Sequence, residues 1–105
     1  MNTQTQKNET RSQQTRAMVN TGNGAVLLKK LCRHFAHKVP TTLTEEQGII
    51  EFPFGRCLLT ATASQLDLTI EVGNPDDTDK AEQVVGSHLQ RMSREEELTV
   101  NWNRI

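Results

Sequence analysis

The sequence has no apolar run long enough to cross a membrane, and its N-terminus lacks the apolar centre of a secretory signal. Both absences predict a cytoplasmic protein with no membrane partner. Cysteine is scarce, and Cys32 and Cys57 fit that compartment as free thiols rather than as a disulfide framework. The spacing of the two cysteines matches no zinc knuckle.

Tyrosine is absent, and the formal net charge of the 105 residues is −1. This balance is not that of a general nucleic-acid binder, and the expected sheet lacks the aromatic pair that stacks RNA bases. Neither a glycine-rich phosphate loop nor a serine nucleophile motif is present. Because no acid–base pair can be placed at working distance, the sequence favours a non-catalytic role.

Apolar side chains are also nearly missing from residues 1–13, where the initiator Met1 is the only one. A segment with nothing to bury cannot offset the conformational entropy that folding costs. We therefore predict a disordered N-terminal tail at residues 1–14 and one domain at residues 15–105.

The rest of the chain alternates between strand-like and helix-like hydrophobic patterns. Helical spacing is strongest in the first helix, where Leu27, Leu28 and Leu31 recur, and Pro40 ends the pattern. The predicted order is strand 15–20, helix 24–38, strands 48–54, 56–62 and 65–72, helix 78–93 and strand 98–104. Two one-faced helices and a sheet with one apolar face predict an α+β fold of two layers. Its five-stranded, mostly antiparallel sheet would carry both helices on one face.

Several segments together resemble one bacterial family, the domain of unknown function 2218. They are Leu31–Pro40, Ile50–Cys57, and His88–Leu89 leading into Glu96–Trp102, and the resemblance extends over about residues 15–104. The family has no established activity. Its members are small proteins or domains attached to siderophore-interacting, flavin-dependent ferric reductase-like proteins, so the resemblance implies a link to iron or siderophore metabolism and such a reductase as a partner. The family often has aromatic residues where this chain has Met92 and Arg94, which argues against a ligand role there.

The densest group of chemically active side chains is Cys32, His34 and His37. On a helix, His34 and His37 can share a face, whereas Cys32 lies about 200° from His34 and points into the core. One hypothesis is a partial metal site of two histidines that another element completes. The alternative is that His34 lies at the core edge and His37 faces water, because polar and cationic residues suit a helix C-terminus.

A second candidate group lies between the predicted layers. Cys57 should face the helices, whereas Cys32 and His88 should face the sheet. These groups could bind a soft metal or form a thiol–imidazole pair, and a metal set of His34, Cys57 and His88 would take zinc or iron. Alternatively, His88 is a core histidine bonded to a backbone carbonyl, or forms a structural polar bridge with His34.

The hairpin tip Pro53-Phe54-Gly55 is unusually apolar. Phe54 could contact a small molecule or a partner, or it could fold back under the first helix, which we favour slightly.

We expect a non-catalytic binding or accessory module. Its site should lie where the end of the first helix meets the inner face, at His34, His37, Cys57 and His88. Cationic Arg33 or Lys38 at the mouth would suit a small anionic ligand such as a ferric chelate. The alternatives are a small Cys/His metal-binding or thiol-redox protein, and a structural subunit that forms a homodimer.

Overall fold

A computed structural model describes residues 12–94 and 96–105. Most of the predicted tail lies outside these residues. The first strand, β1, begins at Gln13 rather than at Thr15 and ends at Asn20.

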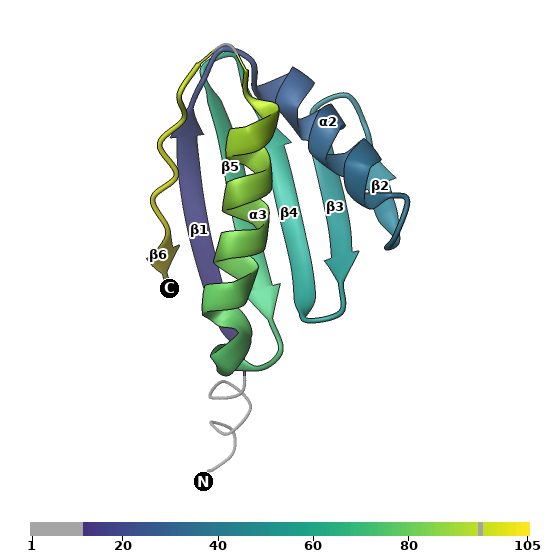
Figure 1. The fold of residues 1–105 in the computed structure, drawn as a ribbon, viewed down its shortest axis with the longest axis vertical. Helices are drawn as coiled ribbons and strands as arrows, with labels where there is room; N and C mark the ends of the chain where they lie inside the picture. The colour runs from purple at the N-terminus through teal and green to yellow at the C-terminus, as the bar shows by residue number, and fades with distance from the viewer. Residues whose placement is uncertain (1–11, 95) are drawn as a thin grey trace, which may run out of the picture.

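The predicted α+β class is confirmed, and within the described residues the sheet has six strands instead of the predicted five (Figure 1). The strands run in the spatial order β2-β3-β4-β5-β1-β6, and every neighbouring pair is antiparallel. The elements in chain order are β1 (Gln13–Asn20), α2 (Gly24–Phe35), β2 (Thr41–Leu43), β3 (Gln47–Phe52), β4 (Gly55–Ala61), β5 (Gln65–Val72), the short 3₁₀ helix η2 (Pro75–Asp77), α3 (Thr78–Met92) and β6 (Asn103–Arg104).

Both helices cover the same face of the sheet, with α2 over β3 and β4 and α3 over β5 and β1 (Figure 1). The strand patterns explain this arrangement. In β5, Leu66, Leu68, Ile70 and Val72 are buried, whereas the residues between them are only partly covered. Successive side chains of a strand point to opposite faces, so one face of the sheet takes the apolar set.

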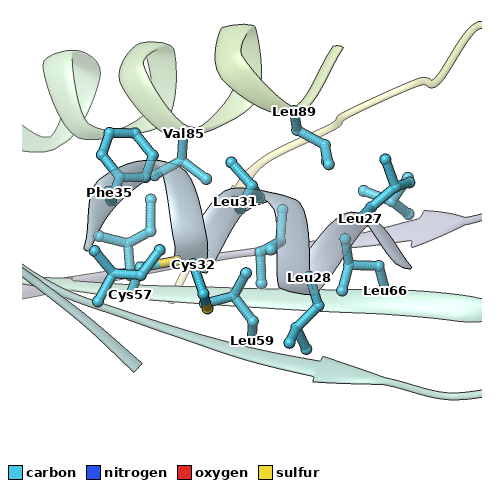
Figure 2. Close-up of a cluster of buried hydrophobic side chains, with 14 of the residues drawn as sticks. Leu27, Leu28, Leu31, Cys32, Phe35, Cys57, Leu59, Leu66, Val85 and Leu89 are labelled. Carbon is cyan, nitrogen blue, oxygen red and sulfur yellow. The ribbon is translucent and has the colours of Figure 1, made fainter. Parts of the chain in front are cut away.

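The core fills the space between the sheet and the two helices. Figure 2 shows Leu28 and Cys32 directed from α2 toward the sheet, while Leu31 and Phe35 lie toward α3. A close approach at Gly48 makes room for Cys32, because a Cβ atom there would lie 2.5 Å from the Cys32 Sγ atom. Both cysteines are free thiols inside this core, as predicted.

The first helix is shorter than predicted and ends at Phe35 rather than at Lys38. The backbone N–H groups of Lys38 and Val39 both donate to the carbonyl of Phe35, which closes a turn instead of a further helical turn. Pro40 then directs the chain into β2, an edge strand that the sequence prediction missed because three residues carry too little pattern. As a result, His37 lies in the turn after α2 and not on the helix.

The predicted strand at 98–104 is also mostly wrong. Only Asn103 and Arg104 pair with β1, while the segment before them is irregular. Leu98 is buried, and Trp102 is partly buried beside Gly86 of α3. The alternation that the sequence shows there therefore reflects packing against α3 and not ladder formation.

The apolar hairpin turn at residues 53–54 was predicted correctly, with β3 ending at Phe52 and β4 beginning at Gly55. Gly55 has a φ of 155°, and a Cβ atom there would come within 1.9 Å of the Glu71 carbonyl oxygen. Only glycine fits this position.

Across the described ranges, the helices are too short or too polar to cross a membrane.

Candidate functional site

The C-terminal parts of the two helices meet at His34 of α2 and His88 of α3. The ring centroids of the two histidines lie 5.1 Å apart at an interplanar angle of 46°. The Phe35 ring contacts both, with centroid distances of 4.9 Å to His34 and 5.0 Å to His88. The two helices are therefore joined by ring contacts around a buried phenylalanine, and among the described residues no hydrogen bond of the predicted polar bridge links His34 to His88.

His88 is fixed in orientation by its own helix. Its Nδ1 atom lies 2.7 Å from the carbonyl oxygen of Val84, one turn earlier in α3. A carbonyl can only accept, so Nδ1 carries the proton of this hydrogen bond. This is the backbone-bonded histidine that the sequence offered as one alternative, although His88 is only partly buried.

His34 is exposed on the last turn of α2. Its pKa is lowered from 6.5, first because neighbouring groups partly desolvate the ring and then because of positive charge on His88, Lys38, His37 and Arg91. The His34 ring is therefore mainly neutral at pH 7.

A pocket of about 560 Å³ lies between the C-terminal parts of α2 and α3. Among residues 12–94 and 96–105, its lining contains four permanently cationic side chains, three histidines and one methionine, and no carboxylate. These residues are Lys30, Arg33, His34, His37, His88, Arg91, Met92 and Arg94. Among the described residues, none of the four cations forms a salt bridge. The pocket therefore has a positive potential that no nearby carboxylate in the described structure neutralises.

The helix ends make this concentration of cations physically reasonable. The pocket lies at the C-terminal ends of α2 and α3, where helix dipoles favour cations. The second half of α2 and the last turn of α3 line the same depression, so the cationic side chains that suit the negative end of each helix dipole are gathered there.

The two cysteines do not belong to this pocket. Cys57 is fully buried and Cys32 nearly so, and burial raises the pKa of both thiols. Cys32 further raises the pKa of Cys57. Both thiols are therefore protonated at neutral pH, which disfavours the thiolate that reacts.

The predicted metal set is not assembled. Within residues 12–94 and 96–105, no three His, Cys, Asp or Glu side chains lie together in a way that could hold a metal ion. His34 and His88 meet at the pocket, whereas Cys57 is enclosed in the core beneath α2.

The other predicted site residues divide between the pocket and its surroundings. Arg33 and His37 line the pocket. Lys38 is exposed beside it and close enough to affect His34. Phe54 lies elsewhere, because its ring stacks on Phe52 with centroids 4.8 Å apart, and Phe52 in turn contacts Phe35. Phe54 thus folds back toward the first helix, as we slightly favoured.

Sequence reasoning missed half of the pocket, namely Lys30, Arg91, Met92 and Arg94. A signal for two of them was present, because Arg91 and Met92 follow His88 at helical spacings of three and four residues. Met92 and Arg94 were set aside because they depart from the residues that the resembled family often has there.

Chemically, this arrangement can attract and hold an anion. Guanidinium groups form paired hydrogen bonds with carboxylate or phosphate oxygens, and a lysine supplies a mobile positive charge. Apart from Met92, every described residue of the lining is a cation or a histidine, so the lining offers several hydrogen-bond donors to an anion.

Comparison with known proteins places this architecture in one family. The family described as an uncharacterized protein conserved in bacteria, DUF2218, matches residues 16–103. The chain is similar to PA4090 from Pseudomonas aeruginosa, whose structure was determined by NMR. The two are 31% identical, with a TM-score of 0.73 over 87% of this chain and 95% of that chain. No curated protein gives a match. The chain belongs to the DUF2218 family of bacterial proteins.

Proposed function

We propose that the protein is a non-catalytic binding module that takes a small anionic ligand in the pocket between α2 and α3. One observation carries the proposal: four cations and three histidines line a single depression, and no carboxylate of the described residues is in its lining. Such a lining raises the local concentration of anions and gives them several donors at once.

The pocket has dimensions that suit a small molecule. Its volume of about 560 Å³ lies within the range of roughly 300–1,000 Å³ that is typical of small-molecule sites. Its cations come from two different helices, with Lys30 and Arg33 on α2 and Arg91 at the end of α3. A ligand bound there would therefore be held from both sides.

The described arginines outside the pocket are each paired with a carboxylate. Arg16 pairs with Asp67, and Arg104 pairs with Asp79 and Glu82. These arginines sit among carboxylates, whereas those of the pocket face one another. Mutual repulsion of like charges is relieved when an anion enters, so binding is favoured electrostatically.

A ferric chelate is one anionic ligand that fits this proposal. The resemblance to a family associated with siderophore-interacting reductase-like proteins motivates it, and such a reductase would be the partner. The cationic lining supports the charge of the ligand and says nothing about the metal.

The test is a two-dimensional ¹H–¹⁵N NMR titration of the full chain with acetate, benzoate, citrate, pyrophosphate and gallium(III) citrate. Gallium stands in for ferric iron without paramagnetic broadening. We expect at least one anion to shift amide signals of residues 30–37 and 88–94 specifically, with an affinity that falls as salt rises. If none of the anions shifts these signals, the proposal is wrong.

Two charge-removing variants sharpen this experiment. Arg91→Gln removes a cation from the pocket lining and should weaken binding. Arg56→Gln removes the same charge from an exposed position of β4, where its partner is Glu51, and should leave binding unchanged. Equal effects of the two variants would indicate nonspecific attraction to overall charge.

A further inference from the structure

We infer that the preferred ligand of this pocket is an aromatic carboxylate, whose ring lies on His34, His88 and Met92 and whose carboxylate meets the surrounding cations. The inference rests on the proposed function, because it names the class of anion that the same pocket takes. Its basis is the unequal character of the two parts of the lining.

The pocket has a partly buried floor and an exposed mouth. His88 and Met92 are partly buried, whereas Lys30, Arg33, Arg91 and Arg94 are exposed. The residues nearest the core are thus an imidazole and a thioether, and the charges stand at the opening. A ligand that matches this gradient has an apolar body and a charged head.

The floor is held in place from below. His88 is anchored through Nδ1 to the Val84 carbonyl, and its ring packs on the buried ring of Phe35. Phe35 continues through Phe52 to Phe54, with successive centroid distances of 4.9 Å and 4.8 Å. The floor therefore ends a row of packed rings that gives it little freedom to move.

These groups favour a planar ring over an aliphatic one. Imidazole and guanidinium planes stack on aromatic faces, and thioether sulfur makes favourable contacts with aromatic edges. His34 adds an exposed imidazole next to His88 at a tilt of 46°, which forms a second surface for the same ring.

A small hydrophilic anion makes fewer favourable contacts in this pocket. The backbone near the pocket belongs to helix C-terminal ends, which present carbonyl oxygens and not N–H donors. Acetate or citrate would rest on long, exposed side chains alone. An aromatic carboxylate keeps the same charge contacts and also removes apolar surface from water.

The deciding experiment compares benzoate, 1-naphthoate, acetate and citrate by the NMR titration of the full chain at constant ionic strength. We expect benzoate and 1-naphthoate to bind on the order of tenfold more tightly than acetate, and more tightly than the more highly charged citrate. A ranking that follows charge, with citrate first and benzoate equal to acetate, would overturn this inference and leave the anion-binding proposal standing. Absence of any shift would overturn both.

Two variants at exposed positions report on the ring contacts. His34→Ala should remove most of the preference for benzoate over acetate, because it deletes one surface against which the ring packs. Met18→Ala serves as the control, because it shortens an exposed side chain of β1 that does not line the pocket. If both variants keep the full preference, the aromatic ring does not lie on His34 and the inference is wrong.

Discussion

The imidazole of His34 on α2 lies with its centroid 5.1 Å from that of His88 on α3, and Phe35 packs against both. This contact joins the last turn of α2 to α3 one turn before α3 ends at Met92. It brings the side chains that precede and follow each histidine around one depression. The cationic pocket is thus a consequence of how the two helices pack across the sheet.

The pKa of His34 provides a direct measure of this environment. We expect an NMR titration of the histidine ring protons to give His34 a pKa below 6.5, because partial desolvation and then the nearby positive charges disfavour its protonated form. An anion bound in the pocket should raise this pKa. A value at or above 6.5 in the free protein would contradict the positive potential described here.

The lowered pKa of His34 also makes the stability of the protein depend on pH. Because the pKa of His34 is lower in the folded than in the unfolded chain, the unfolded state takes up the proton more readily. The contribution of His34 to stability is therefore fully present above pH 6.5 and is lost as the pH falls through its folded pKa. In His34→Gln, this part of the acid destabilisation should be absent from urea unfolding curves recorded between pH 7 and pH 5.

The hydrogen bond of His88 should be dispensable for folding. Its acceptor, the Val84 carbonyl, also receives the backbone N–H of residue 88 in a regular α-helix, so removal of the imidazole leaves no unsatisfied group. We expect His88→Leu to change the free energy of unfolding by less than about 1 kcal/mol in urea denaturation. A loss of several kcal/mol would instead identify a structurally required imidazole.

The sequence predicted the class, the layers and the inner face because these follow from local periodicity. Alternation in β5 and helical spacing around Leu28 are strong signals, because buried positions recur at a regular spacing along the whole of each element. Chain ends and edges were harder to predict. The alternation at 98–102 was read as a strand although its side chains pack on α3, and β2 was too short to show a pattern.

The site was predicted in part for a related reason. Periodicity placed His88 on the inner face of its helix and His34 at the core edge, but it could not give the crossing of α2 and α3. That crossing determines which cations share a pocket, so Lys30 and Arg94 were missed. The crossing also leaves Cys57 in the core beneath α2 and outside the pocket. The alternation of β4 shows which face of the sheet Cys57 points to, but it does not show whether the thiol there is buried or free to bind a ligand.

The thiols offer a test of the redox alternative. Cys32 and Cys57 are buried in the core, and burial raises the pKa of each. We expect neither to react with iodoacetamide at pH 7.5 within the time that alkylates free cysteine, and both to react in denaturing urea. Mass spectrometry of the intact protein would count the modified thiols. Rapid alkylation of the folded chain would revive a thiol-based function.

The C-terminal segment is held to the domain by a small polar network centred on Glu82. Its carboxylate accepts a hydrogen bond of 2.7 Å from the buried Thr15 hydroxyl and also pairs with Arg104 of β6. Asp79 pairs with the same arginine, but its side chain is 89% exposed against 16% for Glu82. Only Glu82 therefore satisfies a buried group as well as a surface charge.

This difference gives a matched pair of variants. Glu82→Ala should lower the free energy of unfolding by about 1–3 kcal/mol, because the Thr15 hydroxyl is left buried without its partner. Asp79→Ala removes an exposed ion pair to the same arginine and should cost less than about 1 kcal/mol. Urea denaturation of the two variants at pH 7 measures the difference, and the double variant Thr15→Val/Glu82→Ala should recover part of the loss. Equal costs for Glu82→Ala and Asp79→Ala would mean that Arg104, and not the buried hydroxyl, accounts for the contribution of Glu82.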